Sequence, residues 1–198
     1  MAKTLVTGRE SMTSKARVQG FFRGEETDRV PIKMAWNPLI RQRVMEHFEA
    51  ETGEELQQAL GVDFMGVGAP YKGPKLFEDV PGRNVNPLFG CRTRWVEHGS
   101  GGYWDYCDFP LEHATPDEVA AWPFADPNDF DYSGIEGQLD AHSEMGVHCG
   151  DAGLACIMNT VGFIRSMEQM FVDLVTDDEA GLLLIDKLMA HQLGVVER

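Results

Sequence analysis

The stretch Asp28-Arg29-Val30-Pro31-Ile32-Lys33-Met34-Ala35-Trp36-Asn37-Pro38 decides the fold that this sequence predicts. Apolar residues alternate with others between Arg29 and Trp36, which is typical of a buried β-strand. Asn37 then suits a helix N-cap, and Pro38 suits the first helical position. A strand, a cap and a helix together form the start of a β/α unit. In such units the functional side chains follow the carboxyl ends of the strands, which here points to Trp36 and Asn37.

Two later segments predict further parallel strands. Residues 62–69 form an apolar run that contains Gly66 and Gly68, and residues 146–149 form a shorter one. The two glycines either let a ligand approach the backbone closely or allow tight packing of a helix on the strand. Strands that alternate with helical patterns indicate an α/β fold.

Residues 88–111 differ in style from the rest of the chain. Residues 92–98 and 103–109 are rich in aromatic and β-branched residues, and they flank Gly99-Ser100-Gly101-Gly102. This pattern predicts an antiparallel hairpin. An insertion of this kind between β/α units shapes the mouth of a pocket.

Helical periodicity covers much of the remaining sequence. Residues 1–12 read as a flexible arm. A helix is expected over residues 14–23, with Thr13 or Ser14 as its cap and four apolar side chains toward the core: Ala16, Val18, Phe21 and Phe22. Residues 163–175 predict one amphipathic helix, and a last helix begins near Asp177-Asp178-Glu179, whose acidic side chains suit its positive amino end.

Composition and charge narrow the class of protein. The chain has 198 residues, of which 43% are hydrophobic and 25% charged, and its formal net charge is −15. This charge argues against binding to nucleic acid or to an anionic membrane surface. No apolar run approaches the roughly 18 residues of a membrane-spanning helix, and the amino terminus does not resemble a secretory signal. We therefore expect a cytoplasmic protein.

The cysteines and histidines show no metal-binding spacing. The four cysteines are expected to be reduced thiols that either pack as small apolar groups or bind a metal: Cys91, Cys107, Cys149 and Cys156. His148 and Cys149 are adjacent, so on a strand they point to opposite faces and cannot bind one metal ion together. The other histidines read as surface residues: His47, His98, His113, His142 and His191.

Several of these segments resemble one known family. They are the helix that leads into Arg23-Gly24-Glu25-Glu26, the stretch Asp28-Arg29-Val30-Pro31, and the hairpin followed by Phe109-Pro110-Leu111 and an acidic stretch. They look like the amino-terminal half of the uroporphyrinogen decarboxylase superfamily, as does the segment 162–178. The resemblance implies a (β/α)8 TIM barrel, which takes about 250 residues. We therefore expect residues 13–198 to form the amino-terminal part of such a barrel, with roughly three strands and an inserted hairpin near residues 88–111.

The resemblance is closer to one branch of that superfamily than to the other. The decarboxylases carry an arginine-rich motif after the first strand, whereas this chain has Met34-Ala35-Trp36-Asn37-Pro38 there and places Arg41 and Arg43 later, inside a helix. Ala69-Pro70 stands where those enzymes have a strand-end carboxylate. A methyltransferase that moves a methyl group between a small substrate and a corrinoid protein is therefore favoured. The alternatives are a uroporphyrinogen decarboxylase and a non-catalytic half-barrel that binds a partner.

Five residues at strand ends are the candidates for the site. Trp36 and Tyr71 would wall a substrate, with Asn159 as a further contact. Asn37 either contacts substrate or only caps its helix, and Asp151 acts either as a general base or as a helix cap.

The cofactors and partners follow from the resemblance. The chain itself is expected to hold no cofactor, because zinc in the related methyltransferases is bound by the carboxyl-terminal half of the barrel. A full-length relative would use zinc and a corrinoid protein. Besides a small-molecule substrate, we expect a homo-oligomer or association with a missing half of the barrel. Arg165 either binds an anion or forms a solvated salt bridge.

Overall fold

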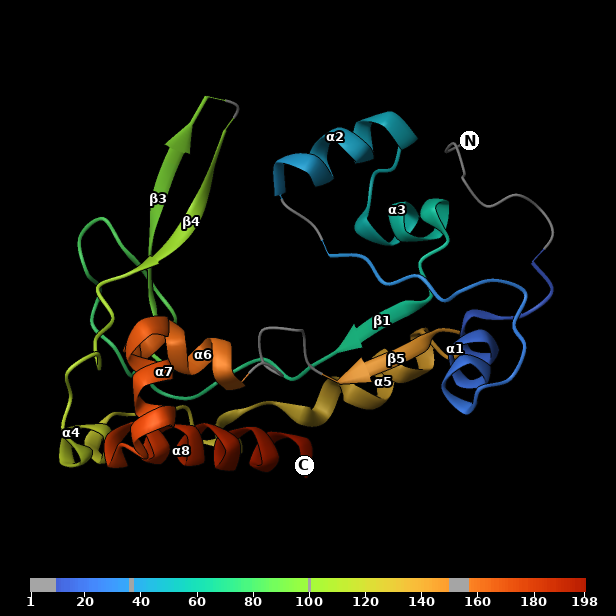
Figure 1. The fold of residues 1–198 in the computed structure, drawn as a ribbon. Helices are drawn as coiled ribbons and strands as arrows, with labels where there is room; N and C mark the ends of the chain where they lie inside the picture. Colours follow the sequence, from blue (N-terminus) through green and yellow to red (C-terminus); the bar gives the residue numbers. More distant parts are fainter. Residues whose placement is uncertain (1–9, 36–37, 100, 150–156) are drawn as a thin grey trace. The chain divides into compact units, whose positions relative to one another are not determined.

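The computed structural model describes residues 10–35, 38–99, 101–149 and 157–198. The chain divides into two compact units, each of which is treated by itself (Figure 1). Unit 1 runs to Val67 and includes Gly134–Cys149, and unit 2 takes in Gly68–Ser133 and Gly150–Arg198. The fold is mixed α/β, with a parallel sheet of two strands and an antiparallel sheet of three.

The parallel sheet lies in unit 1. It pairs β1 (Phe64–Val67) with β5 (Gly146–Cys149) in a register that runs from Phe64↔Gly146 to Val67↔Cys149. The helices of this unit are α1 (Ser14–Arg23), α2 (Pro38–Phe48), α3 (Gly53–Leu60) and α5 (Ile135–Ala141). The prediction of parallel strands in these two segments is confirmed, and their carboxyl ends lie at the same edge.

Helix α1 has the predicted bounds but not the predicted buried face. Thr13 Oγ1 accepts a hydrogen bond from the Ala16 amide, and Gly24 ends the helix with a φ of 73°. Val18 is buried as expected, and Arg17 and Gly20 are buried beside it, while Ala16 is exposed and Phe21 and Phe22 are 50% and 74% exposed. The sheet beside α1 has only two strands in the described part of the chain, so it covers a narrow stripe of the helix.

The predicted first strand is wrong over the residues that the structure describes. Residues 30–35 form no strand, and Val30 is 70% exposed. One main-chain hydrogen bond ties the segment to the start of β1, from Asp63 N to Ile32 O at 2.8 Å. Alternating apolar residues need a ladder of such bonds to form a strand, and this segment is fixed mainly by side chains instead.

The antiparallel sheet lies in unit 2 and includes the predicted hairpin. Its strands are β2 (Asn84–Val85), β3 (Arg92–His98) and β4 (Gly101–Cys107), in that order. Pairing of β3 with β4 is unbroken from Arg92↔Cys107 to His98↔Gly101. The hairpin near residues 92–109 is confirmed, whereas the two-residue strand β2 was not predicted because it carries no pattern of its own.

The helices of unit 2 enclose the larger core. They are α4 (Pro116–Ala121), α6 (Ile157–Arg165), α7 (Met167–Thr176) and α8 (Glu179–Val196), with short 3₁₀ turns at Pro127–Asp129 and Tyr132–Gly134 (Figure 1). Residues from α4, α6 and α8 meet in the centre, where five side chains are 0% exposed: Val119, Val161, Ile164, Leu184 and Leu188. Burial of each such side chain contributes about 1.5–3 kcal/mol.

The single helix predicted over residues 163–175 is two helices. Ser166 interrupts it with a φ of 66°, and its hydroxyl accepts a hydrogen bond from the Gln169 amide at 3.2 Å, which starts α7. The apolar periodicity continues across this break, so the sequence pattern did not reveal it. In the described part of the chain, no helix has the length and apolar character needed to cross a membrane.

Candidate functional site

The sequence-predicted site residues are only partly described. Trp36, Asn37 and Asp151 lie outside the described residues. Tyr71 follows β1 and Asn159 lies on α6, both in unit 2. No hydrogen bond or ring contact joins Tyr71 to Asn159, so the structure does not bring these two together.

Tyr71 belongs to the loop that follows β1, and hydrogen bonds join this loop to residues 129–131. Its ring packs against Phe130 with centroids 5.3 Å apart, and its hydroxyl donates to Pro74 O at 3.0 Å. On either side, Lys72 N donates to Asp129 O and Asp131 N donates to Pro70 O. Burial raises the pKa of Tyr71, and the charge of Asp129 adds to this shift, so the phenol stays protonated near neutral pH. Tyr71 can therefore wall a ligand, with its hydroxyl held inside its own loop.

Asn159 is a solvent-exposed residue in the first turn of α6. An amide in this position can donate and accept hydrogen bonds, which suits recognition of a polar substrate group. It remains a candidate for substrate contact.

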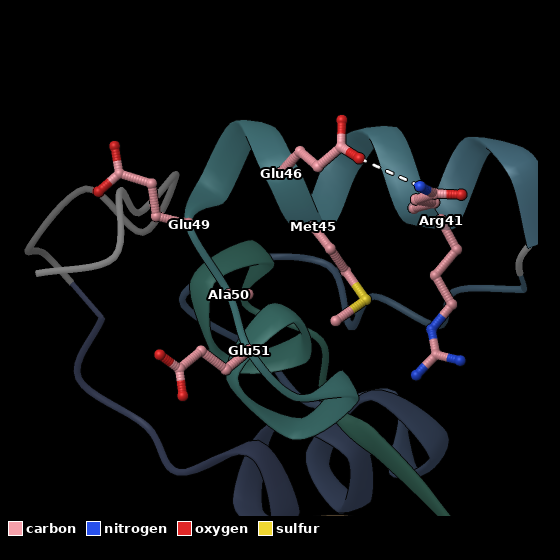
Figure 2. Close-up of a pocket in the computed structure, with 7 residues that line it drawn as sticks. Arg41, Met45, Glu46, Glu49, Ala50 and Glu51 are labelled. Carbon is pink, nitrogen blue, oxygen red and sulfur yellow. Dashed lines mark hydrogen bonds between the residues drawn. The ribbon is translucent and has the colours of Figure 1, made fainter.

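A hollow of about 490 Å³ lies beside α2 and the turn before α3 (Figure 2). Figure 2 shows Arg41 and Met45 extending from α2 toward α3, while Glu46 points away and is joined to Gln42 by a hydrogen bond of 3.2 Å. Glu49 and Glu51 lie at its rim. Its lining has no histidine, cysteine or hydroxyl group that could act as a nucleophile. It can bind a polar molecule through its arginine and its glutamates.

The strongest electrostatic feature of unit 1 is a buried ion network around Asp63. The side chains of Arg17 and Asp63 are 1% and 0% exposed, and Arg17 Nη1 donates to Asp63 Oδ1 at 2.5 Å. Arg29 donates to the same carboxylate from Nη1 at 2.5 Å and from Nη2 at 3.1 Å. The Ser14 hydroxyl and the Ile32 amide each donate to it at 2.8 Å.

This network serves structure rather than chemistry. A carboxylate has about four lone-pair sites, and the five donors on Asp63 occupy them. Burial opposes ionisation of Asp63, but the bonds from Arg29, from the Ile32 amide and from its other donors outweigh it, and the net pKa is lowered. Arg17 binds Asp28 through two nitrogens, which places the Asp28 pKa far below its usual range. No group in the network is left to react with a substrate.

Arg165 is a second buried arginine, and its surroundings correct one expectation from the sequence. It forms an ion pair with Asp173, a second one with Asp178 at 3.0 Å, and donates to Leu111 O and Ala114 O. The guanidinium is thus a salt-bridge partner, but it is only 4% exposed rather than solvated. It joins α6, α7 and the start of α8 and has no donor free to hold an anion.

His191 corrects another expectation, because it is buried rather than on the surface. It is 5% exposed on α8, and its Nδ1 lies 2.7 Å from Ala125 O, so Nδ1 carries the proton. The rings of Phe89, Phe124 and Phe130 surround it at centroid distances of 5.0 to 6.3 Å. Burial lowers its pKa.

The structure gives partial answers on the thiols and on metal binding. Cys91 and Cys107 are free and buried, and burial raises the pKa of Cys91 to about 12. His148 lies on β5 with its ring near Phe64, at a centroid distance of 6.4 Å. The side chain of Cys149 and all of Cys156 lie outside the described residues. In the described ranges, no three His, Cys, Asp or Glu side chains form a group that could hold a metal ion.

Searches against protein families, curated proteins and solved structures found no match to this chain.

Proposed function

We propose that this chain forms part of a TIM-barrel methyltransferase of the uroporphyrinogen decarboxylase superfamily. Its reaction would move a methyl group between a small substrate and a corrinoid protein. Tyr71, in the loop that follows β1, and Asn159 would be among the substrate contacts, with Trp36, Asn37 and Asp151 as further candidates.

The position of Asp63 is the observation that carries this proposal. Its carboxylate binds Arg29 and the Ile32 amide, which belong to the stretch on which the resemblance rests. Its carbonyl accepts a hydrogen bond from Gly146 N at 2.8 Å, where the parallel pairing of β1 with β5 begins. The stretch from Asp28 therefore meets the start of both parallel strands, as the entry to a β/α barrel requires.

The decarboxylase alternative has less support. Uroporphyrinogen carries many carboxylates, and a site for it needs cations that are fixed and free to bind them. In unit 1 the guanidinium groups of the buried Arg17 and the partly exposed Arg29 are bound to Asp28, Asp63 and Glu10. Arg41 and Arg43 are exposed on α2, so neither is held in place by burial.

Zinc does not fit the residues that the structure describes. The related methyltransferases bind it through histidine and cysteine, and no such group is formed by the described side chains. No step of the proposed reaction is therefore assigned to a metal ion here. What these residues supply is the wall of the substrate site and its attachment to the strands.

Methylcobalamin, offered both free and on a corrinoid protein, tests the proposal directly. With a panel of small thiols as acceptors, and with the protein that supplies the rest of the barrel present, we expect a loss of the methyl–cobalt absorption band that depends on this chain. Tyr71→Ala should weaken the reaction, whereas Tyr103→Ala, which alters a tyrosine on the hairpin, should not. Uroporphyrinogen is offered in parallel. Formation of coproporphyrinogen would establish the decarboxylase instead, and inactivity toward both substrates would favour a non-catalytic, partner-binding role.

A further inference from the structure

Strand β4 has an outer edge with no partner in the described structure. It is the last strand in the order β2-β3-β4, and no described main-chain group bonds to its other side. Edge strands that avoid pairing usually carry proline, lysine or a bulge. Over Gly101–Cys107 this strand has neither residue type, and its unbroken register leaves no bulge. The edge is open to an added strand.

One face of the same hairpin carries two indoles that are half exposed. Trp95 and Trp104 lie directly opposite each other, with ring centroids 5.5 Å apart, and are 46% and 53% exposed. Tyr106 lies on the same face and stacks on Phe163 of α6, at a centroid distance of 3.5 Å. Figure 1 shows the hairpin extending beyond α6 and α7. Within unit 2, therefore, α6 covers only the inner end of this face.

Gly102 lets the Trp95 indole lie close to the backbone of β4. A Cβ atom at Gly102 would lie 2.4 Å from the Trp95 ring, so this indole lies over the backbone of β4. A side chain at this position would push the ring away. The two strands thus present two exposed indoles, inclined at 68° to each other, beside an open edge.

The charge on this face is negative. Side chains alternate between faces, so Trp95 and Trp104 share theirs with Glu97, while Arg92 and Arg94 lie on the opposite face. Glu97 is exposed and forms no ion pair in the described structure. Indole faces and a carboxylate both attract cations, and Arg or Lys is the common protein partner of an exposed tryptophan. The net charge of −15 adds a long-range attraction for basic partners.

We propose that the β4 edge and the indole face bind an extended, basic segment of another protein. The segment would add as a strand beside β4, with main-chain hydrogen bonds to its open edge. Alternate side chains of a strand share one face, so Arg or Lys at every second position would lie over Trp104 and beside Glu97. A small organic cation fits less well, because small-molecule sites are concave and bury most of their ligand, whereas these two indoles are 46% and 53% exposed.

Three nine-residue peptides test this proposal with the whole chain. One alternates threonine with arginine, the second has glutamate in place of arginine, and the third contains the residues of the first with the arginines grouped together. Binding is followed by tryptophan emission and by calorimetry. We expect the alternating arginine peptide to bind roughly tenfold more tightly than the grouped one, and more weakly as salt rises. The glutamate peptide should not bind.

Variants on the two faces of the hairpin distinguish binding at this site from non-specific electrostatic attraction to the acidic protein. Trp104→Ala should weaken binding of the alternating peptide roughly tenfold, which is the scale of one cation–π contact. Tyr103→Ala is the matched control, because Tyr103 is 47% exposed on the opposite face of the same strand. Glu97→Gln keeps the shape of the side chain and should reduce both the affinity for the peptide and the salt dependence of binding. This variant keeps the proposal testable if Trp104→Ala disturbs the hairpin.

Four results would overturn the proposal. They are failure of the alternating peptide to bind, equal binding of the glutamate peptide, equal losses in the Trp104→Ala and Tyr103→Ala variants, and a dimer that Trp104→Ala dissociates. The last would assign the edge to a second copy of this chain.

Discussion

At the scale of single residues, Asp63 determines how unit 1 is joined. Its carboxylate binds α1 through Arg17 and binds the segment before β1 through Arg29 and Ile32. Two arginines share this one buried acid, so their charges depend on it. Loss of one partner in a buried ion pair costs more than the pair itself contributes, because the remaining charge stays without a counter-ion.

Asp63→Asn should therefore destabilise the protein strongly. We expect the free energy of unfolding, measured by urea titration and far-UV circular dichroism, to fall by roughly 3–5 kcal/mol. Glu46→Gln is the control, since Glu46 is exposed and its recorded partner is the neutral Gln42. That variant should change the free energy by less than about 0.5 kcal/mol. Equal stability of the two variants would show that the network contributes little.

His191 makes the free energy of unfolding depend on pH just below pH 6.5, above the range in which Asp28 and Asp63 take up protons. Burial lowers its pKa below the ordinary value of 6.5, although the Ala125 carbonyl and the charge of Asp126 partly oppose the shift. The unfolded chain then binds a proton that the folded chain excludes. The charged group that acts on it is Asp126, and Lys187 lies one turn earlier on α8. The contribution of His191 is complete above about pH 6.5 and is lost as pH falls toward the folded pKa.

His191→Gln should flatten the stability profile between about pH 7 and pH 5. The wild-type protein should lose stability across this window, whereas the variant starts lower at pH 7 and changes less. His113→Gln, at an exposed histidine, should retain the wild-type slope. Below this window both proteins should lose stability, because the lowered pKa values of Asp28 and Asp63 make their contributions disappear as those groups protonate. Parallel slopes for His191→Gln and wild type would contradict the assignment.

At the scale of elements, the sequence predicted those helix ends and turns that are determined by residues close to them in the chain. Thr13 caps α1, and this helix has the predicted bounds of residues 14–23. The glycine-rich turn likewise marks the hairpin. In each of these cases the signal and the structure lie within a few residues of each other.

Elements and burial that depend on distant partners were predicted less well. The segment before β1 has the alternation of a strand, but its fixing bonds come from Asp63, 31 residues away along the chain from Ile32. His191 is buried because Ala125, 66 residues away, offers its carbonyl. Of the candidate site, the sequence marked the Tyr71 loop through its place after a strand. It did not mark the Asp63 network, although a charged residue within the apolar run 62–69 was a usable signal.

Lys187 links α8 to the end of α4 and gives a prediction at this scale. Its Nζ donates to Val119 O, Ala120 O and Trp122 O, each at 2.8 Å, and so caps the last turn of α4. Lys187→Met keeps the length of the side chain but removes all three bonds. We expect a loss of roughly 1–3 kcal/mol in the free energy of unfolding, because part-buried carbonyls lose their donor. Lys75→Met, at an exposed lysine paired with Asp79, should cost less than about 1 kcal/mol, and an equal loss there would refute the capping role.

At the scale of the whole molecule, several helical apolar side chains remain uncovered. Phe171 and Val175 on α7 are 58% and 82% exposed, and Leu193 and Val196 on α8 are 55% and 67% exposed. The parallel sheet of unit 1 has only two described strands, and sheets of this size are seldom stable alone. Helices that flank a β/α barrel normally bury such faces against neighbours, and exposed patches of this kind indicate an interface or a tendency to aggregate.

We therefore predict that the 198-residue chain is not a catalytically competent monomer. Sedimentation should show dimers, larger aggregates or, with a protein that supplies the rest of a barrel, a complex, and metal analysis should find no stoichiometric zinc. The double variant Phe171→Ser/Val175→Ser should shift the sedimentation toward the monomer, because it removes the largest exposed apolar groups of α7. The matched control is Phe22→Ser/Val30→Ser, whose residues are 74% and 70% exposed in unit 1. If the α7 face drives association, the control should sediment as the wild-type protein does. A stable wild-type monomer with bound zinc and methyl-transfer activity would contradict the prediction and show that this face needs no partner.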